Sequence, residues 1–169
     1  MQAFATDIIT RAAQAAGLPD GRIIDMVKKD NLTIERPRIE VQFMPEKYTR
    51  TGRKLAVSNT KTEHLRKREL YRVELTVNVN ALADDRAWLE AFSVDFVAAL
   101  PSGGNDSRGN WVKVRAQQTK SNRPPDKRVG DEVIEVFTKV NRLFVLTFTG
   151  RITREETEKL VPSISLNYK

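Results

Sequence analysis

The residues of this chain that could do chemistry are mainly lysines and arginines, and they are densest in the segment 46–72. Nine basic residues stand there against three glutamates, so the segment has a net charge of +6, while the whole chain of 169 residues carries +7. Side chains at this density attract phosphate groups or an acidic protein surface. The basic residues of the segment are Lys47, Arg50, Arg53, Lys54, Lys61, Arg66, Lys67, Arg68 and Arg72.

A second basic stretch, 106–128, has a net charge of +5 and includes Arg115, Lys120 and Arg123. The rest of the chain therefore carries a net charge of −4. A molecule with basic loops and a mildly acidic body can bind phosphates, and it can also pack against copies of itself or against an acidic neighbour.

Catalytic chemistry has little support in the sequence. The single histidine, His64, lies inside the basic segment, where a solvated loop residue is the simpler interpretation. Asp126, Glu132, Glu135 and Lys139 are residue types that metal-dependent nucleases use, but they fit the wet face of a hairpin better. The chain has no cysteine, no glycine-rich phosphate loop and no HExxH motif. We therefore expect no enzyme and neither a metal site nor a cofactor.

Nucleic-acid binding is the alternative that the basic segments favour. Sequence-neutral binding of single strands uses aromatic side chains on which bases stack, and the segment 46–72 offers only Tyr48 and Tyr71. No helix-turn-helix, zinc-finger or RNP-like pattern is present. What remains is an accessory protein that contacts phosphates without sequence preference through its basic loops.

The hydrophobic periodicity predicts a helix over 3–16, because Phe4, Ile8 and Ala12 recur on one helical face. Strict alternation predicts strands over 37–45 and 71–80. These two strands should pair antiparallel, which makes the basic segment between them the tip of a long hairpin.

The second half of the chain alternates helix and strand signals. Asp84 or Asp85 can cap a helix that carries an aromatic stripe, and strands follow over 111–118, 133–140 and 143–150, the last two joined by a turn at Asn141. The sequence from Thr153 to Glu156 matches a capping box and predicts a short helix to Leu160. A final alternating run, 163–168, is a candidate edge strand containing Ile164, Leu166 and Tyr168.

These elements predict an α+β fold with a mainly antiparallel sheet of about four to five strands, two helices packed on one face, a long hairpin arm and a C-terminal extension. We expect a single domain over 1–169, divided into an N-terminal helix and first strand (1–45), the basic arm (46–72), a strand–helix–strand core (73–150) and the extension (151–169). No apolar run is long enough for a membrane helix and the first residues do not read as a signal peptide, so we expect a soluble protein with no membrane contact, made in a cytoplasm.

The order of the expected elements resembles the tail terminator proteins of long-tailed bacteriophages. The resemblance covers roughly residues 3–150. It rests on the strand 37–45, on the long strand 71–81 that runs straight into the sequence DDRAWL at 84–89, and on the strand 144–149. The chain departs from the common pattern in the length of its basic connection and in the residues after Gly150.

The resemblance implies a virion structural protein, made in the host bacterial cytoplasm and located in the tail or neck. Such proteins form a ring, typically a hexamer, that caps the tail tube and joins the tail to a neck or head-completion protein. On this interpretation the partner-contacting residues are Arg50, Arg53, Lys54, Lys61, Arg66, Lys67, Arg68, Ile164, Leu166 and Tyr168. Arg115, Lys120 and Arg123 would face the lumen and make non-specific contact with passing DNA.

Overall fold

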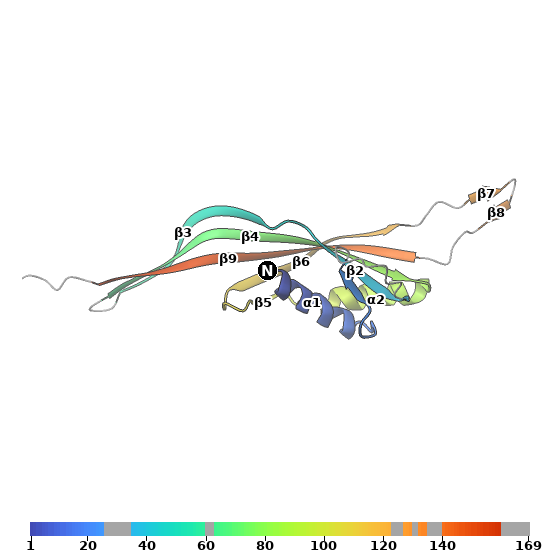
Figure 1. Ribbon diagram of the computed structural model, residues 1–169, viewed down its shortest axis with the longest axis horizontal. Helices are drawn as coiled ribbons and strands as arrows, with labels where there is room; N and C mark the ends of the chain where they lie inside the picture. The colour runs from blue at the N-terminus through green and yellow to red at the C-terminus, as the bar shows by residue number, and fades with distance from the viewer. Residues whose placement is uncertain (26–34, 60–62, 123–126, 130–131, 135–139, 160–169) are drawn as a thin grey trace, which may run out of the picture.

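Two very long antiparallel strands, β4 and β9, organise the computed structural model of the protein (Figure 1). The structure describes residues 1–25, 35–59, 63–122, 127–129, 132–134 and 140–159. The elements in chain order are α1 (Gln2–Ala15), β1 (Ile23–Asp25), β2 (Arg38–Phe43), β3 (Lys47–Asn59), β4 (Glu63–Ala83), α2 (Arg86–Ala99), β5 (Gly103–Asn105), β6 (Trp111–Asn122), β7 (Lys127–Val129), β8 (Glu132–Ile134) and β9 (Val140–Lys159).

Seven strands form the main sheet in the order β1-β2-β4-β9-β6-β5, with β3 also pairing with β4. The central pair runs without interruption from Glu63 opposite Lys159 to Ala83 opposite Val140, apart from one register shift near Glu69. Every pairing in this sheet is antiparallel except that of β1 with β2. The α+β class and the mainly antiparallel sheet are therefore confirmed, but the expected count of four to five strands is wrong.

The neighbours of β4 and β9 change along their length, and this change divides the sheet. β2 leaves the edge of β4 at Phe43 opposite Val77, and β3 takes the same edge from Lys47 opposite Glu74 onward. On the other side, β6 pairs with β9 only as far as Thr149. We call the part with both helices, β1, β2, β5, β6, residues 73–83 of β4 and residues 140–150 of β9 the body. We call β3, residues 63–72 of β4 and residues 151–159 of β9 the arm.

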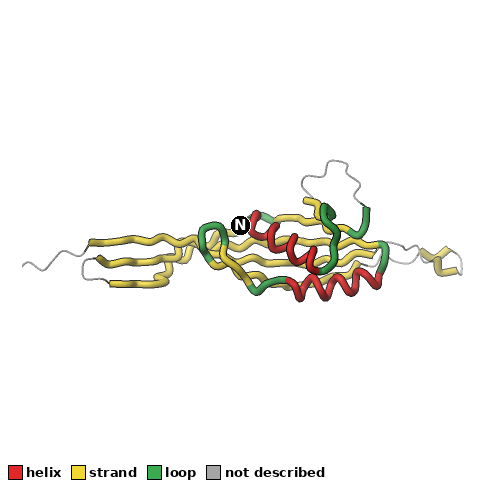
Figure 2. Tube along the Cα trace, turned by 90° about the horizontal axis from the view of Figure 1, so that it is seen from below, coloured by secondary structure: helices red, strands yellow, loops and turns green. Residues whose placement is uncertain are grey.

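Both helices cover one face of the body, and the arm projects away from them (Figures 1 and 2). The alternation expected at 71–80 is confirmed: Leu75, Val77 and Val79 are buried and stand opposite Phe148, Leu146 and Phe144 of β9. Phe4 of α1 packs edge-on against Phe148 at 6.4 Å. The core therefore lies between the helices and the middle of the sheet.

The second helix forms as the sequence predicts. Asp85 is its N-cap, and its side chain accepts a hydrogen bond from the backbone N–H of Ala87 at 2.8 Å. Along its inner face Phe92 stacks on Phe96, with ring centroids 5.6 Å apart, and Phe96 meets Phe144 edge-on at 5.0 Å. The aromatic stripe thus packs across the sheet.

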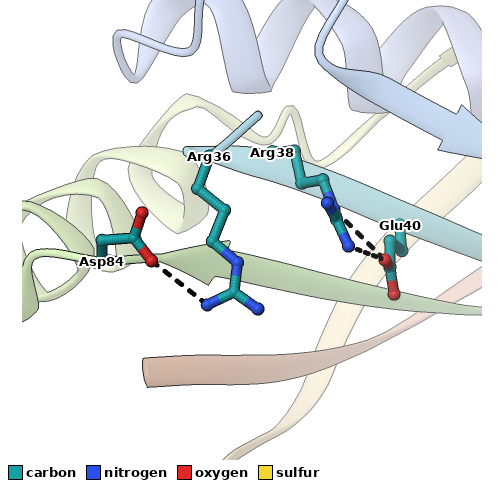
Figure 3. Close-up of polar contacts among 4 residues, drawn as sticks. All are labelled: Arg36, Arg38, Glu40 and Asp84. Carbon is teal, nitrogen blue, oxygen red and sulfur yellow. Dashed lines mark hydrogen bonds and ion pairs between the residues drawn. The ribbon is translucent and has the colours of Figure 1, made fainter. Parts of the chain in front are cut away.

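One ion pair joins the start of β2 to the end of β4, and a second lies within β2 itself (Figure 3). Arg36, just before β2, contacts Asp84, just after β4, at 3.3 Å. Within β2, Arg38 donates to Glu40 at 2.9 Å. The Arg36–Asp84 contact holds the entry of β2 beside the N-terminus of α2, as expected for a strand that pairs with β4.

The chain after Gly150 does not form the expected helix. Residues Thr153–Lys159 continue β9 and pair with Glu63–Glu69 of β4. The Thr153 hydroxyl donates to Asn110 Oδ1 at 3.3 Å and does not cap a helix. The backbone ladder with β4 satisfies the same N–H and C=O groups that a helix would use, so tertiary pairing overrides the local capping-box signal. The expected division between 150 and 151 falls inside one strand.

The turn expected at Asn141 is also wrong. Asn141 lies within β9, opposite Leu82 on one side and Asn122 on the other. The partner of β8 is β7, in a separate two-stranded sheet. The edge strand expected over 163–168 lies outside the described residues. Among the described residues, no helix is long and apolar enough to cross a membrane.

Candidate assembly interface

The arm is a three-stranded sheet that buries almost nothing of its own. No helix covers either of its faces in the two views of the chain (Figures 1 and 2). Among the arm residues whose burial the structure describes, Glu69 is the single buried one. Its large apolar side chains, such as Tyr48, Val57 and Leu65, are 38–55% exposed. An isolated sheet without an apolar face is marginal in water, so contacts other than a core must hold this one.

Ion pairs between β4 and β9 supply part of that support. Arg66 contacts Glu158 at 3.4 Å, Lys67 contacts Glu155 at 2.8 Å and Arg68 contacts Glu156 at 3.9 Å. These side chains are 34–56% exposed, so each pair contributes about 0–1 kcal/mol. The C-terminal residues thus neutralise the basic cluster of β4 in part.

Sequence reasoning missed this pairing, although a signal was available. The run Glu155, Glu156 and Glu158 has the opposite charge and nearly the same length as the run Arg66, Lys67 and Arg68. A strand interpretation of 151–159 would have placed the two runs opposite each other.

Glu69 marks the root of the arm and was not expected to have a special role. Its side chain is fully buried, and its carboxylate lies 3.7 Å from the Nε atoms of both Arg72 and Arg151. Neither carboxylate oxygen has a hydrogen-bond partner among the residues that the structure describes. Arg53 of β3 stands opposite Glu69 in the ladder, and the Thr51 hydroxyl donates to the Glu69 carbonyl at 3.1 Å.

Glu69 also coincides with the register shift between β4 and β9. A shift of this kind twists a strand and re-aims the residues that follow. A buried carboxylate between two arginines therefore marks the point where the body ends and the arm begins.

The outer edge of β3 has no neighbour among the strands that the structure describes. β4 is the only described strand that pairs with β3, so the far side of Lys47–Asn59 presents backbone N–H and C=O groups to solvent. Arg50, Arg53 and Lys54 are exposed on this strand, and no described acidic side chain lies within ion-pair distance of them. The expected partner residues of β3 are therefore accessible.

The outer edge of β9 is unpaired along the arm as well. β6 leaves β9 after Thr149, and no other described strand takes its place beside Arg151–Lys159. The arm thus has two free edges of different composition. Unpaired edges of this length are templates for pairing with another chain, and single-chain proteins usually protect them.

A groove of about 540 Å³ lies at the junction of arm and body. It is lined by Phe4 and Asp7 of α1, by the turn that contains Asp106 and Arg108, and by the start of β3. The N-terminal ammonium of Met1 contacts Glu46 here at 3.4 Å.

Tyr48, at the rim of this groove, donates a hydrogen bond to Glu46. That hydrogen bond to the carboxylate, with desolvation and the nearby negative charge, raises the pKa of the Tyr48 phenol above its usual value. The described residues contain no cluster of three His, Cys, Asp or Glu side chains that could hold a metal ion.

The other predicted site residues lie elsewhere. Arg115 is exposed on β6 and faces away from the helices, because its neighbour Val114 stands opposite the buried Phe148. Lys120 is also on β6, opposite Leu143. The structure does not bring these residues to the arm. Lys61, Arg123, Ile164, Leu166 and Tyr168 lie outside the described residues.

Comparisons with known proteins give little to transfer. No protein-family model and no curated protein matches the chain. A solved structure described as "Virion of native gene transfer agent (GTA) particle" contains a chain that is 17% identical, with a TM-score of 0.35, over 91% of this chain and 100% of that one. Since the TM-score is below 0.5, neither a fold nor a role follows from this likeness, and no family is assigned.

Proposed function

We propose that this chain is a virion structural protein that forms a ring, caps a tail tube and joins the tail to the neck. The observation that supports this role is the arm: a coreless three-stranded sheet with two unpaired edges. Ordering each residue of such a sheet costs roughly 1–2 kcal/mol of conformational entropy, and surface ion pairs return about 1 kcal/mol or less each. Contact with a neighbouring subunit or tube protein would offset the difference.

Two different free edges suit a ring. Subunits of a cyclic oligomer associate head to tail, so each needs two different, complementary surfaces. We expect a homo-oligomer, and a hexamer if it follows the tail terminator proteins that the sequence resembles. Its other partners would be a tail tube protein on one face and a neck or head-completion protein on the other. Arg115, on the helix-free side of the body, and Lys120, further along the same strand, would tolerate passing DNA.

Electron microscopy of the purified protein, with its mass in solution, tests this role. We expect ring-shaped particles whose mass is a multiple of the 19.2 kDa chain and which survive nuclease and moderate salt. A species that stays strictly monomeric, both alone and with tail tubes, would exclude the ring.

A second candidate is a nucleic-acid-binding accessory protein, supported by the uncompensated cations of β3. Its DNA affinity would fall steeply with salt because binding releases counterions. Replacing Arg50, Arg53 and Lys54 together by Gln should then reduce the DNA affinity. It should also reduce the slope of log K against log salt concentration by the amount that about three phosphate contacts contribute. If the affinity of this triple variant equals that of the parent, DNA binding by the arm is wrong.

A further inference from the structure

The two free edges of the arm differ in charge in a way that selects a partner. β3 carries Lys47, Arg50, Arg53 and Lys54 and no acidic residue, so its net charge is +4. The free part of β9 has no net charge, because its acidic run Glu155, Glu156 and Glu158 is balanced by Arg151, Arg154 and Lys159. We propose that β3 of one subunit pairs edge to edge with β9 of a second copy of this chain, so that the arms form one continuous sheet around the ring. This proposal rests on the ring role above and specifies how the ring closes.

Like-with-like pairing is disfavoured by the same charges. Two β3 edges brought together would set four cations against four, and like charges on opposed strands are destabilising. Pairing of β3 with β9 sets cations against the acidic run. It is also a contact between two different surfaces, which generates rings where the rotation closes.

The strand directions agree with this arrangement. Both β3 and β9 are antiparallel to β4, so they run parallel to each other within one arm. When neighbouring arms point the same way, β3 of one subunit and β9 of the next form a parallel pair. In this pair the matching faces of the two arms lie on the same side.

The register of the arm predicts which residues meet. Lys54 stands opposite Arg68, which stands opposite Arg154, so Lys54 and Arg154 are level and on one face. Displacing the neighbouring arm by two residues, about 6.6 Å, puts Lys54 opposite Glu156. A stagger between adjacent strands is what closure of a sheet into a barrel requires.

The same displacement also forms an ion pair on the other face of the sheet. Arg53 is level with Thr153 through Glu69, so a shift of two residues puts it opposite Glu155. It also brings Arg50 level with Arg154, whose charge is offset by Glu156 of its own strand at 3.7 Å. The shift also puts Lys47, which is level with Thr149 through Glu74, opposite Arg151. One stagger therefore forms the ion pairs Lys54–Glu156 and Arg53–Glu155 at the outer half of the arm and leaves basic residues opposite each other at its root.

Charge reversal of the two edges tests the pairing. We expect that the variants Arg53→Glu/Lys54→Glu and Glu155→Lys/Glu156→Lys are each monomeric, and that mixing them restores rings in which the two chains alternate. Every interface of the mixed ring again sets two basic against two acidic residues. Restoration on mixing also shows that each variant chain is folded.

A matched control is Arg11→Glu/Arg86→Glu, which makes the same change in net charge on exposed sites of α1 and α2. This control should form rings like the parent. If the Arg53→Glu/Lys54→Glu chain forms rings by itself, the edge pairing is wrong and the ring role stands. If the parent chain is monomeric alone and on tail tubes, both are wrong.

Cysteine cross-linking gives an independent readout, because the chain has no cysteine. Lys54→Cys/Glu156→Cys should yield, on oxidation, a ladder of covalent oligomers on a denaturing gel up to the ring number. Within one subunit the two positions are separated by β4, roughly 10 Å, which is too far for a disulfide.

The single variants separate the alternatives. Lys54→Cys alone and Glu156→Cys alone should remain monomeric on the same gel. A covalent dimer of the Lys54→Cys chain would instead indicate β3–β3 pairing, and a dimer of the Glu156→Cys chain would indicate β9–β9 pairing. Either dimer, without a ladder from the double variant, would overturn the proposal.

Discussion

At the scale of single residues, Glu69 is the most constrained side chain of the arm. It is fully buried, and Arg72 and Arg151 approach its carboxylate to 3.7 Å without forming a hydrogen bond. Removing one member of a buried charge group costs more than the group itself contributes, because the remaining charges lose their partner. The negative charge of the Glu69 carboxylate therefore allows Arg72 and Arg151 to lie close to the same point of the sheet.

The substitution Glu69→Gln keeps the shape of the side chain and removes its charge. We expect it to lower the free energy of unfolding by about 1–3 kcal/mol, since a buried group loses its charged partners. Equilibrium urea unfolding followed by circular dichroism measures this change. Glu74→Gln, at an exposed position of the same strand, is the control and should shift the midpoint little. Equal midpoints for the two variants would show that the charge of Glu69 does not contribute to the stability of the fold.

At the scale of elements, the buried apolar residues gather in the body, and none lies among the arm residues whose burial the structure describes. The core cluster is built from α1, α2 and the body sections of the sheet. β2 reaches β4 before β3 begins, so the body ladder is complete without the arm. The two parts should therefore differ in their dependence on partners.

A chain without the arm tests this division. Replacing residues 46–74 by Asn-Gly joins β2 to β4 through a tight hairpin turn, and ending the chain at Arg151 removes the arm section of β9. We expect a folded, cooperatively melting monomer that cannot form rings or cap tubes. Near-ultraviolet circular dichroism and mass in solution measure the two properties. Failure of this chain to fold would mean that the arm stabilises the core.

The sequence predicts the body well because its elements carry their own signals. The alternation from Tyr71 to Asn80 and the cap at Asp85 are local patterns, and both are confirmed. The strand over 151–159 has no such pattern, since a sheet with two wet faces needs no alternation of apolar residues. The sequence signal for a strand here is the charge match of Glu155 and Glu156 with the basic run of β4. That contact joins residues nearly ninety positions apart. The capping-box signal at Thr153 was therefore misleading.

At the scale of the whole molecule, the protein combines a body with a buried apolar core and an arm in which Glu69 is the single buried residue among those whose burial the structure describes. Local stability follows the density of buried apolar contacts, so the two parts should open with different free energies. Hydrogen exchange reports this difference directly, amide by amide.

In dilute, monomeric protein we expect slow exchange over 75–81 of β4 and fast exchange along Lys47–Asn59 of β3. Ring formation should slow exchange on β3 and on 151–159 of β9, because both outer edges then find partners, and should leave 75–81 unchanged. Hydrogen–deuterium exchange with mass spectrometry at two protein concentrations makes this comparison. Slowing confined to α1 and α2 would place the contact between subunits on the helices instead.

The continuity of β4 and β9 through arm and body has a mechanical consequence. A flexible tether would let the arm swing, but here the two halves share one hydrogen-bond ladder of about twenty residues, in which the register shift beside Glu69 is the single irregularity. Twist or load applied at the tip must pass along that ladder into the strands under α1 and α2. A partner that binds the arm therefore also sets the orientation of the body, because the same two strands run through both parts.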